Sequence, residues 1–213
     1  YPSGFEEAAI LIVDGGGGLM PAENGVVGGQ DLFEERVTVY RGEGDEISTV
    51  KRYTDGVPSA GYLNNPKHCS LGDFYQSATI FAGFKSGDEG KTMGLAPYGT
   101  DRYFKDFLEA VELENGALSI DGNFQFNKWG IGGGTAYGGR YGKPGSNDGR
   151  PRMQDKDIAA AAQYALEEVL IKIAKEAQRE TKSRNLCLAG GVALNSVANK
   201  KILDRTEFAD VFV

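Results

Sequence analysis

The chain has 213 residues and a net charge of −7, and it is 40% hydrophobic and 25% charged. This balance predicts a globular protein that can bury a core, and no apolar run approaches the roughly 20 residues of a membrane helix. The acidic balance argues against nucleic acid as a direct partner, and two cysteines with no sign of a disulfide favour a cytoplasmic location.

Three antiparallel strands are predicted at the start of the chain. Ala8–Val13 is a continuous apolar run that ends in glycines, as is typical of a central strand. Val37–Tyr40 and Ile47–Tyr53 flank a polar, glycine-containing turn and therefore predict a hairpin. Ser70 can then cap a helix over residues 71 to about 84, in which apolar residues recur at helical spacing.

The middle of the chain predicts an irregular insert over about residues 86–152. It contains a small predicted hairpin, made of Ala117–Ile120 and Phe124–Phe126. Nine glycines fall within Gly130–Gly149, which favours either a surface loop or a flap over a site. Such a flap would carry three side chains that could meet a substrate: Arg140, Tyr141 and Lys143.

Helices and strands alternate in the last third. The longest predicted helix runs from about Asp155 to Thr181, and a strand over Leu186–Ala189, a helix over Val192–Leu203 and a strand over Ala209–Val213 follow. The order βββ-α-α-β-α-β, with a glycine-rich insert, predicts an α/β fold. It matches a ribonuclease-H-like half-domain of the actin, sugar-kinase and Hsp70 superfamily. A strand at the end leaves an open edge, so we expect residues 1–213 to be a single partial domain of a longer polypeptide.

Two glycine turns are the candidate nucleotide-binding loops. Asp14 and four glycines close the first strand, and Gly190 and Gly191 close the strand over Leu186–Ala189. Glycines let the backbone turn sharply and let a ligand lie against the main chain, while a helix start supplies N–H donors. We therefore expect the two turns to converge on one polyphosphate.

Some of these residues have simpler alternatives. Asp14 either holds a divalent cation beside the phosphates or makes a tight turn in which it binds its own backbone. Glu89–Gly99 contains a Gly-Lys pair but lacks the spacing and the leading strand of a P-loop. Lys91 therefore either neutralises a phosphate or belongs to a loop at a helix end. The single histidine, His68, is interpreted as a surface loop residue.

Four stretches in order resemble the O-carbamoyltransferases of nodulation-factor and antibiotic carbamoylation: Ser70–Tyr75, Glu89–Gly99, Asp157–Gln163 and Asn185–Asn199. The resemblance implies the second ribonuclease-H-like half of an actin-like domain similar to the tRNA threonylcarbamoyladenosine synthase subunit. It also implies that carbamoyl phosphate is hydrolysed to carbamate, which reacts with ATP to give carbamoyl adenylate and pyrophosphate. The carbamoyl group then passes to a hydroxyl of a small-molecule acceptor.

The resemblance further implies site residues. Asp14 matches the family's metal-ligating aspartate. The phosphate- and nucleotide-binding positions are matched by Gly15, Gly17, Lys91, Gly190, Gly191 and Asn195. The metal, iron or magnesium, would have an incomplete site here, because residues 1–213 hold no His-x-x-x-His pair. No catalytic residue is assigned, these residues alone are expected to be inactive, and a homodimer is left open.

Two rival interpretations remain. A sugar- or acid-kinase of the same superfamily would use two phosphate loops equally well and would release ADP, but it does not predict the Glu89–Gly99 stretch. A non-catalytic nucleotide-binding module is the other. It would gain support if Asp14→Ala left turnover and metal content unchanged.

Overall fold

The computed structural model describes residues 3–21, 32–57, 67–114, 116–121, 124, 141, 144–145 and 150–213. Contacts group the chain into two compact units, one made of residues 1–64 and 170–213 and the other of residues 65–169. The boundary falls within helix α5 (Met153–Thr181), which contributes residues to both units. The predicted flap side chains Arg140 and Lys143 lie outside the described residues.

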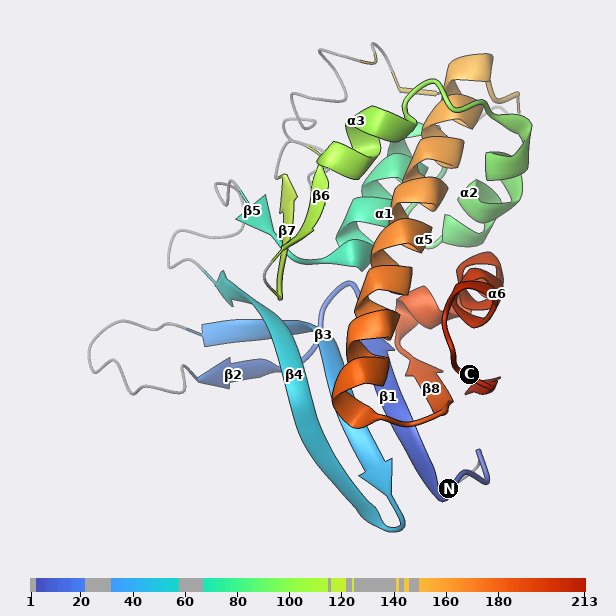
Figure 1. The fold of residues 1–213 in the computed structure, drawn as a ribbon. Coiled ribbons are helices and arrows are strands. Elements are labelled where there is room, and N and C mark those ends of the chain that lie inside the picture. The colour runs from blue at the N-terminus through green and yellow to red at the C-terminus, as the bar shows by residue number, and fades with distance from the viewer. Residues whose placement is uncertain are drawn as a thin grey trace. The chain divides into compact units, whose positions relative to one another are not determined.

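The first unit is built on a six-stranded mixed sheet, shown in Figure 1. Its strands are β1 (Glu7–Val13), β2 (Leu19–Pro21), β3 (Leu32–Glu43), β4 (Glu46–Val57), β8 (Asn185–Ala189) and β9 (Asp210–Phe212). The order is β4-β3-β1-β8-β9, and β2 continues the edge of β3 beyond β1. Strands β4, β3 and β1 are antiparallel, whereas β1, β8 and β9 run parallel. The predicted α/β class and the opening antiparallel triplet are confirmed.

One face of this sheet carries the core of the first unit. Val13 pairs with Val37, which pairs with Tyr53, so these three buried side chains share a face. The last turns of α5 lie on that face, because Glu176 accepts hydrogen bonds from the Tyr53 hydroxyl at 3.0 Å and the Lys51 ammonium at 3.3 Å. Burial and the bond to Glu176 raise the pKa of Tyr53, so its hydroxyl stays a donor at neutral pH.

The predicted helix over Val192–Leu203 is two elements. A 3₁₀ turn, η4 (Gly191–Leu194), is followed by helix α6 (Ser196–Arg205). Asn195 separates them because its backbone is not helical, with φ −78° and ψ 86°. Its side-chain oxygen accepts a hydrogen bond from the Ala198 N–H at 3.0 Å, which caps α6. The prediction of one continuous helix was therefore wrong.

The second unit combines helices with a three-stranded sheet. Its elements are β5 (Lys67–His68), α1 (Leu71–Phe81), α2 (Glu89–Leu95), η2 (Ala96–Tyr98), α3 (Phe104–Glu109), β6 (Val111–Glu114) and β7 (Ala117–Asp121), with the first part of α5. Ser70 caps α1 as predicted, accepting from the Asp73 N–H at 3.0 Å. The sheet order is β5-β7-β6.

This unit corrects the prediction of an irregular insert. Residues 89–121 form regular elements that are too short for a helical or alternating period to stand out. Strand β7 pairs with β6 and β5, and Ile120 has a partner on each side. Most of the predicted partner strand, Phe124–Phe126, lies outside the described residues. Gly116, at φ +74°, permits the tight turn between β6 and β7.

Tyr141 is another correction. Instead of being available to a substrate, it is 1% exposed and packs among Phe81, Phe107 and Phe124. Its hydroxyl donates to the Asp106 carboxylate at 3.3 Å. Tyr141 therefore belongs to the aromatic core of the second unit. In the part of the chain that the structure describes, no helix is both long and apolar enough to cross a membrane.

Candidate functional site

The first glycine turn is a bulge at the edge of strand β3. Val13 of β1 pairs with Val37, and Leu19 of β2 pairs with Glu34, so five residues (14–18) face only two (35 and 36). Two backbone hydrogen bonds hold the ends of the bulge: Asp14 N–H to Arg36 O at 3.0 Å, and Glu35 N–H to Gly18 O at 3.1 Å. The surplus residues are pushed out of the sheet, and residues 16–18 are exposed.

Within this bulge the Asp14 carboxylate makes the short-range bond of a tight turn. Its Oδ1 accepts from the Gly15 N–H at 2.7 Å. No described residue accepts a hydrogen bond from the N–H of Gly16 or Gly17. The turn thus leaves two successive backbone N–H groups on exposed residues, and successive N–H groups can form an anion-binding site.

The second glycine turn joins β8 to η4. Gly190 has φ +91°, a left-handed conformation that favours glycine. A Cβ on Gly190 would meet the Val13 carbonyl oxygen well inside 3.0 Å, so the two backbones touch here. A Cβ on Gly191 would lie 3.2 Å from Oδ1 of Asp14. Only glycine lets the end of β8 approach β1 this closely.

The two turns therefore lie side by side, as the sequence predicts. Strands β1 and β8 are parallel neighbours, with Ile12 opposite Ala189, so both turns leave the same edge of the sheet. The structure brings together Asp14, Gly15, Gly17, Gly190 and Gly191 at the carboxyl ends of these strands. Such ends are where ligands bind in open α/β sheets.

Asn195 stands at the end of η4 and is 7% exposed. Its N–H donates to Val192 O at 3.0 Å, and its Oδ1 caps α6. The helix start is thus offset from the double glycine and occupied by a side chain of the chain itself. The structure gives Asn195 a capping role, while its predicted contact with a nucleotide stays a prediction.

Lys91 belongs to the second unit and is described there alone. It lies on α2, its side chain is 60% exposed, and its ammonium lies 2.9 Å from the Asp88 carboxylate. This hydrogen bond from Lys91 lowers the pKa of Asp88, so the pair stays charged at neutral pH. Lys91 thus lies in a helix, and the Asp88 carboxylate already balances its charge. Its predicted contact with a phosphate stays a prediction.

The rest of the Glu89–Gly99 stretch has packing contacts in the second unit. A Cβ on Gly99 would meet the Lys156 carbonyl oxygen well inside 3.0 Å, so only glycine fits against α5. The next residue, Thr100, donates from its N–H and hydroxyl to Asp157 at 2.8 and 2.9 Å. Thr92 donates to the Thr79 hydroxyl at 2.8 Å. These contacts dock α2 and η2 onto α1 and α5.

A metal site is not complete in this part of the chain. No group of three or more His, Cys, Asp or Glu residues suited to a metal ion occurs among the residues described. Asp14 is the predicted ligand, and one carboxylate does not make a cation site. The role of Asp14 as a metal ligand therefore stays a prediction.

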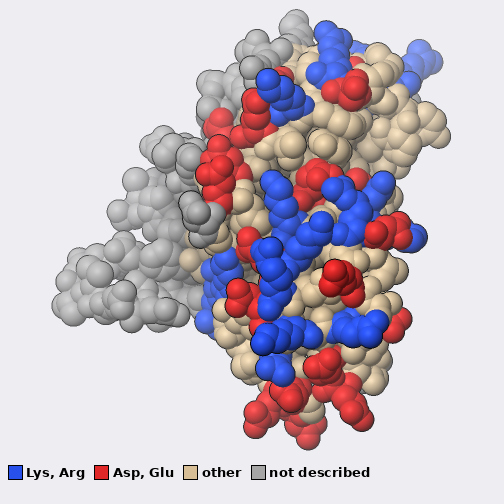
Figure 2. Space-filling model, viewed as in Figure 1, with Lys and Arg blue, Asp and Glu red and all other residues tan. Residues whose placement is uncertain are grey.

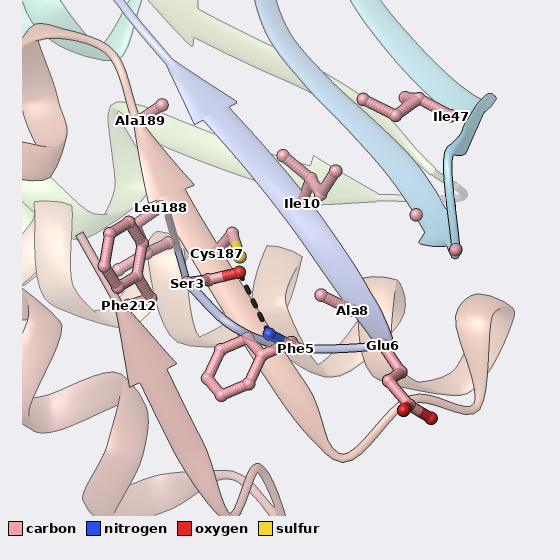
Figure 3. A pocket seen from close by; sticks show the side chains of 12 residues that line it. Ser3, Phe5, Glu6, Ala8, Ile10, Ile47, Cys187, Leu188, Ala189 and Phe212 are labelled. Atoms are coloured by element: carbon pink, nitrogen blue, oxygen red, sulfur yellow. Dashed lines mark hydrogen bonds between the residues drawn. The ribbon is translucent and has the colours of Figure 1, made fainter. Parts of the chain in front are cut away.

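A separate cavity of about 200 Å³ lies on the other face of the sheet in the first unit, seen in Figure 3. Ile10 and Cys187 pair across β1 and β8, and they point into it from the face opposite Val13. Phe5, Ile47 and Phe212 make its lining mainly apolar. None of the predicted site residues lines this cavity.

The negative net charge is not uniform over the first unit. Figure 2 shows Lys and Arg side chains along the last turns of α5, where Lys172, Lys175 and Arg179 are exposed. Cations near a helix C-terminus interact favourably with the helix dipole. This accounts for Arg179, which lies in the last turn of α5, and the cations of one helix give no evidence for a nucleic-acid surface.

Sequence reasoning missed the side chains that contact the bulge. Arg36 donates to the Gly15 carbonyl oxygen and forms an ion pair with Glu34 at 2.9 Å, and both side chains are largely buried, at 3% and 15% exposure. The one signal was a charged run, Glu34-Glu35-Arg36, directly before a predicted strand. A charged run normally indicates solvent exposure, so it predicts an exposed Arg36 instead of the buried one that the structure shows.

The chain matches the protein family described as "Carbamoyltransferase N-terminus" over residues 1–213. Nodulation protein NolO of Bradyrhizobium diazoefficiens is 30% identical over 99% of this chain and 32% of NolO. Nodulation protein NolNO of Sinorhizobium fredii is 30% identical over 99% of this chain and 26% of NolNO. An uncharacterized Synechocystis protein is 30% identical over the whole chain and 31% of its own length.

The chain thus spans about a third or less of the length of these relatives. The family that the four motif stretches predict is confirmed by a match over every residue of the chain. The chain belongs to the carbamoyltransferase N-terminal family.

Proposed function

We propose that this chain is the second ribonuclease-H-like half of the actin-like domain of an ATP-dependent O-carbamoyltransferase. Its first unit holds the phosphates of ATP between the Asp14–Gly18 bulge and the Gly190–Gly191 turn. The observation that carries the proposal is the contact of these two turns at the carboxyl ends of β1 and β8. Family membership supplies the reaction class.

The topology supports the fold assignment. Three antiparallel strands lead into two parallel ones, with α5 directly before β8 and α6 connecting β8 to β9. This is the element order that a ribonuclease-H-like half-domain predicts. Fold alone does not give a function, so the proposal depends on the turns and on the family.

The chemical roles of the turns follow from what they expose. Gly16 and Gly17 offer N–H groups with no side chain to keep a phosphate away, and Gly190 and Gly191 offer bare backbone opposite them. The Asp14 carboxylate would repel phosphates directly, so we assign it to the divalent cation that accompanies them. Such a cation neutralises charge on ATP when bound. The bulge orients the phosphate chain and limits its motion.

The reaction proposed for the whole protein balances in two transfers. An oxygen of carbamate attacks the α-phosphorus of ATP, the bond from that phosphorus to the bridging oxygen of the β-phosphate breaks, and pyrophosphate leaves. The acceptor hydroxyl then attacks the carbamoyl carbon, the bond to AMP breaks, and the hydroxyl proton is lost to a base or to solvent. Carbamoyl phosphate supplies carbamate by hydrolysis. The chain described here binds and orients, and no catalytic side chain is assigned to it.

Isotope exchange tests this chemistry without knowledge of the acceptor. The natural polypeptide that carries residues 1–213 is incubated with ATP, Mg²⁺, carbamoyl phosphate and radiolabelled pyrophosphate. We expect label to enter ATP only when carbamoyl phosphate is present, because carbamoyl adenylate formation is reversible. ADP as the sole nucleotide product would favour the kinase interpretation, and ATP binding without turnover would favour a non-catalytic module.

A further inference from the structure

A buried arginine lies next to the proposed phosphate loop. Arg36 is 4% exposed although it stands on β3 next to the exposed residues of the bulge. Burying a guanidinium carries a large desolvation cost unless it is paired and hydrogen-bonded. Its contacts therefore indicate what the position requires.

The backbone of β3 is irregular at this residue. In the β3–β4 ladder Glu35 pairs with Thr54 and Val37 pairs with Tyr53, so Arg36 is an extra residue with no partner on β4. A β-bulge of this kind re-aims a side chain. The extra residue on β3 lies directly opposite the five-residue bulge between β1 and β2. The two irregularities thus face each other across the same edge.

The Arg36 side chain holds this bulge at Gly15 and is itself held by Glu34. One guanidinium nitrogen, Nη1, donates to the carbonyl oxygen of Gly15, while Nη2 lies 2.9 Å from Glu34 Oε2. The backbone carbonyl of Arg36 also accepts the Asp14 N–H at 3.0 Å. A Cβ on Gly16 would crowd the Glu34 carboxylate and would lie 3.2 Å from Arg36 Nη1. Residues 15 and 16 of the bulge therefore pack directly against the Arg36–Glu34 ion pair.

This geometry explains why the residue is arginine. The planar fork serves a carbonyl and a carboxylate at once, whereas a lysine ammonium on a flexible stem is a single point charge. Because Glu34 balances its charge, Arg36 does not act as a free cation for phosphate. Its contribution is the fixed direction of the bulge backbone.

We propose that Arg36 is a positioning residue that holds the Asp14–Gly18 bulge in the conformation that receives the phosphates of ATP, with Glu34 as its counter-charge. This inference rests on the proposed function, because it assigns the bulge to phosphates. It predicts a selective effect: loss of the fork weakens binding of ATP but not of adenosine, which has no phosphate to place on the bulge.

The test compares Arg36→Lys with Arg52→Lys in the natural polypeptide. Arg52 lies on the neighbouring strand and is ion-paired with Glu35 at 2.8 Å. It is 32% exposed and, among the described residues, makes no hydrogen bond to residues 14–18, so it is a matched control. Calorimetry measures the affinities for ATP with Mg²⁺ and for adenosine, and thermal unfolding without ligand monitors the fold. For Arg36→Lys we expect an ATP affinity about tenfold or more below wild type, with adenosine affinity unchanged. For Arg52→Lys we expect both affinities to match wild type.

A second variant covers the case in which Arg36→Lys does not fold. Glu34→Leu combined with Arg36→Met removes both charges together, and replacing a buried ion pair by apolar groups is often tolerated. It still removes the donor to Gly15, so the same selective loss of ATP affinity is expected. Unchanged ATP affinity in a folded form of either variant overturns the role of Arg36 and leaves the proposed function standing. A wild-type protein that binds no ATP overturns the proposed function and this role with it.

Discussion

The α-carbon of Gly190 lies against the carbonyl oxygen of Val13, so closely that no Cβ fits between them. This contact joins the last residue of β1 to the turn after β8, and it places the two glycine turns at one edge of the sheet. The contact requires glycine at position 190 for two reasons: its φ is +91°, and the Val13 carbonyl already occupies the space that a Cβ would need.

Gly190→Ala should therefore destabilise the first unit. The left-handed backbone alone costs about 1–3 kcal/mol for a non-glycine residue, and the clash with a backbone atom adds to it. We expect a lower unfolding temperature of the natural polypeptide in differential scanning calorimetry. Gly191→Ala is the neighbouring control, since its Cβ would meet only the end of the Asp14 side chain, at 3.2 Å. Equal stability of the two variants would contradict the contact.

A second glycine prediction concerns the shape of the bulge. A Cβ on Gly17 would lie 2.7 Å from the backbone oxygen of Glu35, whereas a Cβ on Gly18 would meet nothing within 4 Å. Gly17→Ala must therefore shift the bulge away from β3, and ATP affinity measured by calorimetry should fall. Gly18→Ala should bind ATP like the wild type. Indistinguishable affinities of the two alanine variants would show that the bulge does not have to keep this shape.

Much of the fold could be predicted where a signal is local and long. The continuous apolar run of β1, the long period of α5 and the Ser70 cap each satisfy a rule that can be read from nearby residues. The adjacency of the turns could be predicted because each glycine turn closes an apolar strand of the same expected α/β sheet. The signals for β1, α5 and the Ser70 cap lie in residues that are close together in the sequence.

The features that were missed depend on partners distant in sequence. Strand β2 exists because it continues the edge of β3, and nothing in three residues announces that pairing. Arg36 looks like a surface residue until Gly15 is placed beside it. Asn195 sat inside an apparent helical period, and its capping geometry was decided by the turn before it. Tertiary contact overrides local pattern for β2 and Arg36. The Asn195 cap is the exception, because its partner Ala198 is only three residues away.

Asn195 offers a test that separates capping from ligand binding. Asn195→Ala removes the acceptor for the Ala198 N–H, which should lower the free energy of unfolding by about 1 kcal/mol. Asn195→Asp keeps a good capping acceptor and should recover most of that loss in urea unfolding. If the side chain also contacts a nucleotide, ATP affinity will fall in both variants. An unchanged ATP affinity of Asn195→Asp would show that Asn195 only caps α6 and does not contact the nucleotide.

The Asp88–Lys91 pair predicts how the titration of Asp88 changes when Lys91 is replaced. The hydrogen bond from Lys91 lowers the pKa of Asp88 in the folded state. A carboxyl with a lowered folded pKa stabilises the fold above its unfolded pKa, and this contribution is lost as the pH falls through the folded pKa. Lys91→Met should move the Asp88 midpoint upward, measured from the carboxyl carbon shift by NMR. Lys105→Met, which removes the partner of Glu109, is the control and should leave Asp88 unchanged.

Asp14→Asn separates the turn from the proposed metal role. The amide oxygen of asparagine can still accept the Gly15 N–H, so the turn and the unfolding temperature should be preserved. The charge is lost, and we expect ATP affinity in Mg²⁺ to fall by about tenfold, while affinity without Mg²⁺ does not fall because a carboxylate that repels phosphates is gone. Asp204→Asn, on the exposed side of α6, controls for the change in net charge. Unchanged Mg²⁺ dependence and unchanged turnover in Asp14→Asn would remove Asp14 from the metal site, and the turns would then support nucleotide binding without catalysis.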